Sequence, residues 1–192
     1  MAATMNLRFC VALIALLPGI AAADAWQGDQ QAGALRFVAT QAGARFSGHF
    51  GEFKVRLEFD PAAPAKGRLE VTIATKSADT ADAERDEVLH GRDFFWVARF
   101  PEAKYHAEGF KRDGKGWIGA GQLTLRGVTQ AVAVRFELKP KQRRLSMKGG
   151  VTLRRLEFGV GQGDWAETTW IGDPVGVSFD LNLHRAAAEI SQ

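Results

Sequence analysis

The chain has 192 residues, with 25 lysines and arginines against 22 acidic residues and a single cysteine, Cys10. This near balance of charge argues against nucleic-acid binding, which usually requires a concentrated basic surface. The length suits one folded domain, and the apolar content suits a packed core that is not held together by disulfides.

The first 23 residues have the pattern of an export signal. A basic residue is followed by the apolar run Phe9–Ile20 and by the small residues Ala21–Ala23. Because the apolar run is too short to span a bilayer, we expect a cleaved signal peptide over residues 1–23 and a periplasmic domain over residues 24–192. Cleavage would remove Arg8 and the cysteine, and would leave a net charge of 24 − 22 = +2.

The next stretch predicts short antiparallel strands. The polar lead Asp24–Ala34 has no strand pattern, whereas Leu35–Thr40 alternates between apolar and polar residues. Phe46–Gly51 is interrupted by glycine and predicts a turn that enters the next strand. Phe53–Phe59 and Arg68–Ala74 alternate without a break, as expected for strands with one buried and one solvated face.

The segment Ala78–His90 breaks this alternation. It carries five acidic residues, and Thr80 predicts the N-terminal cap of a short helical crossover. The acidic residues fit a solvated helix face better than a metal site. The aromatic run Phe94–Trp96 follows, and we expect most of it to be covered because exposed aromatic side chains are costly.

The second half predicts a central hairpin over Gly121–Leu138. Apolar residues alternate on both sides of Gly127, which can take a positive φ at little cost where the chain reverses. A loop is expected from Arg155 to about Trp170. The other strands predicted in this half are Ala103–Phe110, Leu145–Leu153 and Val175–Leu183.

Roughly eight hairpin-linked strands predict an all-β fold, and we favour a single closed antiparallel barrel because closure removes exposed strand edges. The interior of such a barrel is either filled by side chains or holds one small ligand, and the alternation leaves both open. It also leaves open a small outer-membrane barrel with an apolar lipid-facing surface. The polar C-terminal tail and the lack of two aromatic girdles argue against that alternative.

Several motifs occur in a fixed order: Phe59–Pro61, Arg85–Asp86 with Asp93–Phe95, Phe100–Pro101, Leu123–Thr129 and Arg155–Gly159. In this order they resemble the YceI-like family of secreted lipid-binding proteins, over about Leu35–Leu183. The resemblance implies an extended, lipocalin-like barrel whose apolar lumen holds a polyisoprenoid or similar long-chain amphiphile. Trp96 departs from the family pattern, which has a small or acidic residue there, and its bulk is expected to alter the pocket.

The resemblance, together with the alternation that turns apolar side chains toward the barrel interior, predicts a ligand-binding site. Its expected members are the apolar residues Phe94, Phe95, Leu123, Leu125, Val134 and Phe136, with Arg92 and Arg155 as donors to a phosphate or carboxylate head group. Taken singly, each apolar residue could equally fill a packed core, and each arginine could equally be an ordinary surface residue on a turn. The predicted function is periplasmic binding, transport or storage of an isoprenoid or other long-chain amphiphilic lipid.

Recognisable catalytic and metal-binding motifs are missing from the sequence. The four histidines, His49, His90, His106 and His184, lack the spacing of metal ligands, and there is no Gly-x-Ser-x-Gly motif or phosphate-cradling loop. We therefore expect no catalytic residues, no metal and no cofactor other than a bound lipid. The alternative is an enzyme that acts on a similar amphiphile through a histidine or carboxylate at the barrel mouth.

A basic turn is expected near the middle of the second half. It contains Lys139, Lys141, Arg143 and Arg144. These residues suit a transient contact with an anionic membrane surface, and a solvated hairpin tip explains them equally well.

Overall fold

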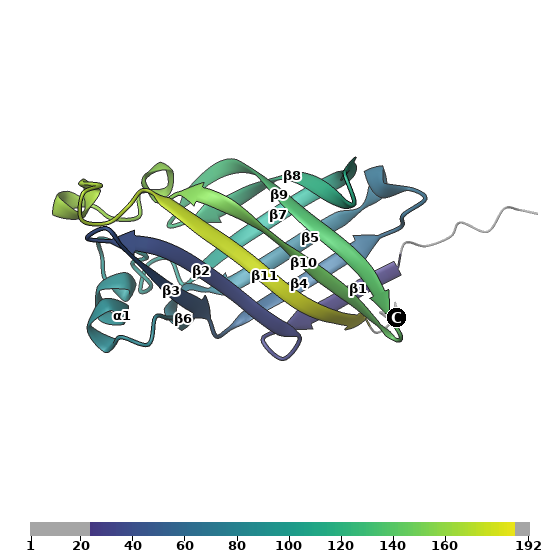
Figure 1. Ribbon diagram of the computed structural model, residues 1–192, viewed down its shortest axis with the longest axis horizontal. Helices are drawn as coiled ribbons and strands as arrows, with labels where there is room; N and C mark the ends of the chain where they lie inside the picture. Colours follow the sequence, from purple (N-terminus) through teal and green to yellow (C-terminus); the bar gives the residue numbers. More distant parts are fainter. Residues whose placement is uncertain (1–23, 187–192) are drawn as a thin grey trace, which may run out of the picture.

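The computed structural model describes residues 24–186, which form an elongated β-barrel with one α-helix near one end (Figure 1). The strands are β1 (Asp24–Asp29), β2 (Gly33–Gln41), β3 (Ala44–Phe50), β4 (Phe53–Phe59), β5 (Arg68–Ala74), β6 (Ala78–Asp79), β7 (Glu102–Asp113), β8 (Gly116–Leu125), β9 (Val128–Lys141), β10 (Arg144–Arg154) and β11 (Pro174–Arg185). The helix α1 is Ala83–His90. The predicted signal peptide lies outside the described residues.

Eight of these strands close into a ring in the order β1-β4-β5-β7-β8-β9-β10-β11, and β11 returns to β1 through the pairs Trp26–Arg185 and Gln27–His184. All of the pairings are antiparallel. The predicted fold class, a closed antiparallel barrel of about eight strands with a short helical crossover, is therefore confirmed.

The ring opens toward one end because β11 changes partner along its length. Its last residues pair with β1, whereas residues 176–181 pair with β2, and β2 continues the sheet to β3 and β6. At this end β3 therefore faces β6 and α1 instead of β5 (Figure 1). We call it the mouth end; the opposite end, which contains the β9–β10 turn, is the filled end.

Charged residues cover the outside of the barrel and apolar residues face its interior. On β7, for example, Lys104 and Glu108 are exposed, whereas Ala103, Tyr105 and Ala107 are buried. This arrangement is the reverse of the outer-membrane barrel that the alternation alone allowed. Among residues 24–186, no helix has the length and apolar character needed to cross a membrane.

Aromatic side chains pack the filled end. Phe59 contacts Phe110 and Trp117, with ring centroids 6.0 and 4.9 Å apart, and Phe110 contacts Phe136 at 5.2 Å in an edge-to-face arrangement. Leu57 and Leu183 beside them are fully buried. Contacts of this kind add to the free energy gained by burying the rings, so this half of the barrel is a conventional hydrophobic core.

Two segments differ from the prediction. The stretch read as a loose lead contains β1, which closes the barrel by pairing with both β4 and β11. The stretch Phe46–Gly51, read as a turn, lies largely in β3; the Phe37 ring occupies the position that a side chain at Gly48 would take. In both segments the pairing partners impose the strand, while the local composition gives no strand signal.

The predicted helical crossover is present, but its cap is not Thr80. Asp82 caps α1, with its Oδ1 accepting from the backbone N–H of Arg85 at 3.1 Å. The Thr80 hydroxyl donates instead to Asp86 Oδ1 at 2.7 Å, which ties the chain before the helix to its first turn. The loop expected after Arg155 is confirmed; it contains the short 3-10 turns Arg155–Phe158 and Gly163–Ala166.

The central hairpin turns through Arg126 and Gly127, whose φ angles are 51° and 76°. Two successive positive φ values are typical of the type I′ turn, which matches the twist of the flanking strands. A Cβ at Gly127 would also lie 2.7 Å from Cε1 of Phe100. Glycine is therefore required here both by backbone conformation and by a close approach.

We expect Gly127→Val to lower the free energy of unfolding by about 1–3 kcal/mol, because a β-branched residue is strained at positive φ. Urea denaturation of the variant measures this loss. Gly114→Val is a matched control, since Gly114 has φ 57° in another hairpin turn with nothing near its Cβ position. A loss at Gly127 no larger than at Gly114 would show that Phe100 does not constrain the turn.

Candidate functional site

A cavity of about 410 Å³ occupies the half of the barrel toward the mouth end. Its wall is formed by inward-facing residues of all the long strands except β1, together with α1 and the loop after β10. The volume lies within the range of about 300–1,000 Å³ found for small-molecule pockets. The barrel is therefore filled at one end and hollow at the other.

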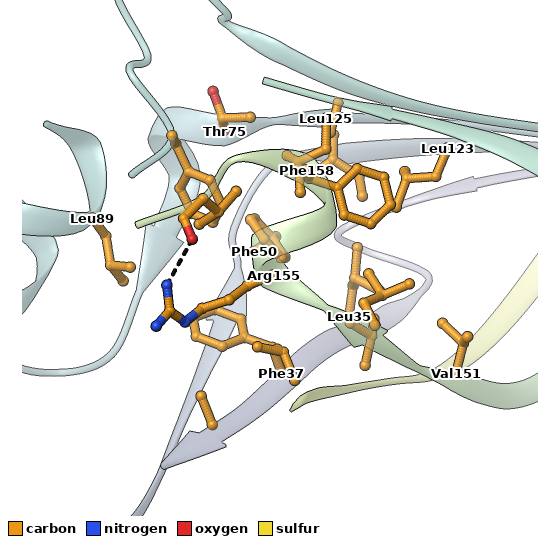
Figure 2. Close-up of a pocket in the computed structure, with 18 of the residues that line it drawn as sticks. Leu35, Phe37, Phe50, Thr75, Leu89, Leu123, Leu125, Val151, Arg155 and Phe158 are labelled. Carbon is orange, nitrogen blue, oxygen red and sulfur yellow. Dashed lines mark hydrogen bonds between the residues drawn. The ribbon is translucent and has the colours of Figure 1, made fainter. Parts of the chain in front are cut away.

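The cavity wall is almost entirely hydrocarbon. Phe37, Phe50 and Phe95 form a connected aromatic row, with centroids 5.4 Å apart between the first two and 6.1 Å between the last two. Leu123, Leu125 and Val151 approach from the other strands (Figure 2). A surface of this composition cannot solvate a charge, so it favours an apolar ligand chain.

Three of the four charged residues that line the cavity, together with Gln41, lie where α1 meets β2 and β3. Arg85 of α1 donates from Nε to Gln41 Oε1 at 3.1 Å, and its Nη2 lies 3.1 Å from Asp82 Oδ2. Its guanidinium also lies over the Phe46 ring, 4.5 Å from the centroid. With Glu84 these residues line the cavity margin, so α1 is held to the β2–β3 hairpin by one arginine at the polar edge of an apolar space.

The structure brings together six of the eight residues predicted for the site. Those that line the cavity are Phe94, Phe95, Leu123, Leu125, Val134 and Arg155. Their contact with a ligand remains a prediction.

Phe136 and Arg92 lie elsewhere. Phe136 is 2% exposed and packs against Phe110 in the filled end. Arg92 is exposed on the outside of the barrel, with its guanidinium 5.1 Å from the Trp96 ring centroid. Strand parity placed Phe136 inside correctly, but it could not show that the space there is already filled. Trp96 also lies outside the cavity, so it does not add bulk to the pocket.

Arg155 is buried in the cavity wall, where Figure 2 shows its guanidinium on the Leu89 side. Its Nε, Nη1 and Nη2 donate to the carbonyl oxygens of Gly172, Val160 and Ile171 at 3.1, 2.8 and 2.7 Å. Burial lowers the pKa of this guanidinium, and the negative charge of Asp173 opposes the shift. These bonds identify Arg155 as the group that fixes the loop over residues 159–172 against the barrel.

Sequence reasoning missed the contribution of β2, β3 and α1. Phe37, Phe50 and Phe46 line the cavity, and Arg85 joins the helix to the hairpin. The parity of β2 already placed Phe37 on the inward face. Nothing in the sequence showed that β3 would be a strand or that α1 would form part of the cavity wall.

None of the four histidines is among the residues that line the cavity. His49, His90 and His106 each directly neighbour a lining residue in the sequence, and the Nε2 of His90 is 3.1 Å from the Ala78 carbonyl oxygen. Within residues 24–186, no group of three or more histidine, cysteine, aspartate or glutamate side chains is placed to hold a metal ion.

Tyr105 is the one tyrosine of the chain and lines the cavity. Its hydroxyl donates to the carbonyl oxygen of Gly119 at 3.0 Å, and the carbonyl oxygen of Val132 lies 3.2 Å from the same hydroxyl. Burial raises the pKa of Tyr105 to about 12. An ordinary tyrosine has a pKa of about 10, so the folded state holds this proton more tightly than the unfolded chain does.

We therefore expect the absorbance of tyrosinate to appear near pH 12 in the folded protein, because Tyr105 is buried, and at about pH 10 in denaturant, where Tyr105 is exposed to water. The stabilisation from this group is complete below about pH 10 and is lost as pH rises through about 12. Tyr105→Phe is the control, because it removes both the signal and this part of the pH dependence. Titration of the folded protein near 10 would show that the hydroxyl is accessible to water.

Comparisons with known proteins agree with the fold. The sequence model of the YceI-like domain matches residues 26–183. Among solved structures, Burkholderia cenocepacia BcnA superposes with a TM-score of 0.77 at 26% identity, covering 80% of this chain and 98% of BcnA. A polyisoprenoid binding domain from Saccharophagus degradans has a TM-score of 0.61 at 12% identity, covering 85% and 99% of the two chains, and shows the fold alone.

Curated relatives match a shorter stretch. A UPF0312 protein of Yersinia pestis (strain Pestoides F) is 41% identical over 91 residues, or 47% of each chain, and a UPF0312 protein of Photorhabdus laumondii is 40% identical over the same length. The chain thus spans about half the length of the curated relatives it matches. Because the YceI-like domain model covers nearly all of the barrel, the chain belongs to the YceI-like domain family.

Proposed function

We propose that this protein binds a single-chain amphiphile of the polyisoprenoid class, with the hydrocarbon chain in the cavity and the polar end at the mouth. One observation carries the proposal: the mouth half of the barrel holds an apolar cavity whose charged lining residues, apart from Arg155, lie beside α1. A protein with a fully packed barrel would have no such space. The role is carriage or storage of the lipid, without chemical change.

The free energy of hydrocarbon burial is sufficient for useful affinity. Each buried methylene contributes about 0.8 kcal/mol, so ten give about 8 kcal/mol. That corresponds to a dissociation constant in the micromolar range before the costs of ordering the chain are subtracted. The branched methyl groups of an isoprenoid would fit the irregular wall that the phenylalanine, leucine and valine side chains form.

Family membership supports the same conclusion. The Saccharophagus domain that shares this fold is described as polyisoprenoid-binding, and we infer a ligand of that class here. We also propose a periplasmic location, based on the export signal expected in residues 1–23. The expected membrane-surface contact of the basic turn stays part of this proposal; the turn lies at the filled end, away from the mouth.

The test is native mass spectrometry of the purified protein, followed by extraction and identification of any retained lipid. We expect added mass from a long-chain lipid, and reloading of the delipidated protein by a long-chain prenol in the micromolar range. The proposal fails if no lipid is retained and the delipidated protein binds neither a prenol nor a fatty alcohol.

A further inference from the structure

A cluster of three arginines surrounds Trp96 on the outside of the mouth end. The guanidinium carbons of Arg92, Arg99 and Arg126 lie 5.1, 4.8 and 5.9 Å from the centroid of the Trp96 ring. Trp96 has φ 47°, an uncommon backbone conformation for a bulky residue, and such outliers persist where the surrounding structure fixes them. We call these four residues the Trp96 cluster.

Two segments far apart in the sequence hold the Trp96 cluster together. Arg126 belongs to the β8–β9 turn, and its Nη2 donates to the carbonyl oxygen of Arg92 at 2.7 Å. Phe100 packs edge-to-face against Trp96 at 5.7 Å, and Arg99 also lies over the Phe100 ring. The guanidinium groups of Arg92, Arg99 and Arg126 thus all lie close to one aromatic ring, which packs against Phe100.

The cluster lacks negative charge of its own. None of the three guanidinium groups forms an ion pair with a carboxylate of the described residues, in contrast to Arg154, which lies 2.8 Å from Asp173. The Nε of Arg126 is buried and has no hydrogen-bond acceptor within residues 24–186. A buried donor without an acceptor is costly, so the fold holds Arg126 here at some expense. Like charges brought together are costly too, and a bound anion would lower that second cost.

We propose that the Trp96 cluster is a binding site for a phosphate group. Three arginine forks suit an anion with several acceptor oxygens, and phosphate offers three where a carboxylate offers two. The phosphate belongs either to the head group of an anionic phospholipid, which the mouth end would then face, or to a free phosphorylated compound. The inference does not depend on the cavity ligand, because the site lies outside the cavity.

The first arm of the test is an NMR titration with inorganic phosphate, observed at the Nε–H signal of Arg126. We expect a saturable shift of this signal. Arg99→Gln and Arg92→Gln, both at exposed positions, should each weaken phosphate binding by about three- to tenfold. Arg36→Gln removes the same charge from an exposed position on β2 and should leave the titration unchanged.

The second arm distinguishes the two sources of phosphate by sedimentation with vesicles of phosphatidylglycerol and phosphatidylcholine. If the source is a phospholipid, Arg99→Gln reduces binding to the anionic vesicles and Arg36→Gln does not. If it is a free compound, the phosphate titration saturates while vesicle binding is the same in both variants. The proposal is overturned if phosphate leaves the Arg126 signal unmoved and Arg99→Gln has no effect on vesicle binding.

Discussion

Phe136→Ala is expected to destabilise the protein by about 3–5 kcal/mol, the range for truncating a buried phenylalanine in a packed core. Phe136 is 2% exposed and contacts the Phe110 ring edge-to-face at 5.2 Å, so its removal leaves a void that the barrel wall cannot close. Urea denaturation of the variant measures the loss. Binding of a long-chain prenol to the folded variant should change little, because Phe136 does not line the cavity.

Phe50→Ala is the matched control for this prediction. Phe50 is only partly buried and borders the cavity, so the same truncation removes fewer contacts and enlarges a space that already exists. We expect a smaller loss of stability and a clear change in prenol affinity. Equal losses of stability at the two positions would contradict the division of the barrel into a filled end and a hollow end.

Leu125→Glu should abolish lipid binding while the barrel stays folded. Leu125 lines the cavity at the last position of β8, close to the mouth end. An unpaired carboxylate in hydrocarbon surroundings costs several kcal/mol, so the bound chain is displaced, but the emptied cavity can admit water to the charge. Retained lipid in native mass spectra, together with far-ultraviolet circular dichroism and a thermal unfolding curve, measures both effects.

Ala131→Glu is the control for the added charge, because Ala131 is exposed on β9 of the same hairpin. It should keep both the fold and the lipid. If Leu125→Glu unfolds the protein while the parent protein carries no lipid, the interior is a packed core and the carrier proposal fails. If the folded variant still retains lipid, the chain binds somewhere other than this cavity.

Strand alternation was sufficient to predict most of the barrel. The bounds of β4 and β5 agree with the segments Phe53–Phe59 and Arg68–Ala74, because each has an unbroken apolar face. It failed for β1, where Asp24–Asp29 has few apolar residues and is ordered by its two neighbouring strands. Parity is a local property, whereas closure of the ring depends on pairing between distant segments.

The alternation of inward-facing and outward-facing side chains could not predict where in the barrel the cavity lies. Val134 and Phe136 are inward-facing neighbours on β9, yet the first lines the cavity and the second fills the core. Only the volumes of side chains from facing strands decide between these outcomes. The two predicted arginines differ for a similar reason: Arg155 is buried by a loop that folds over it, and Arg92 is directed outside by the turn after α1.

The central claim is that a hydrocarbon chain occupies the mouth half of the barrel and leaves the filled half undisturbed. Methyl NMR of the delipidated protein titrated with a long-chain prenol tests it most directly. We expect large shifts for the methyl groups of Leu125, Val132 and Val151, which line the cavity, and small ones for the fully buried Leu57 and Leu183. Shifts confined to surface methyl groups, or spread equally over both halves, would contradict it.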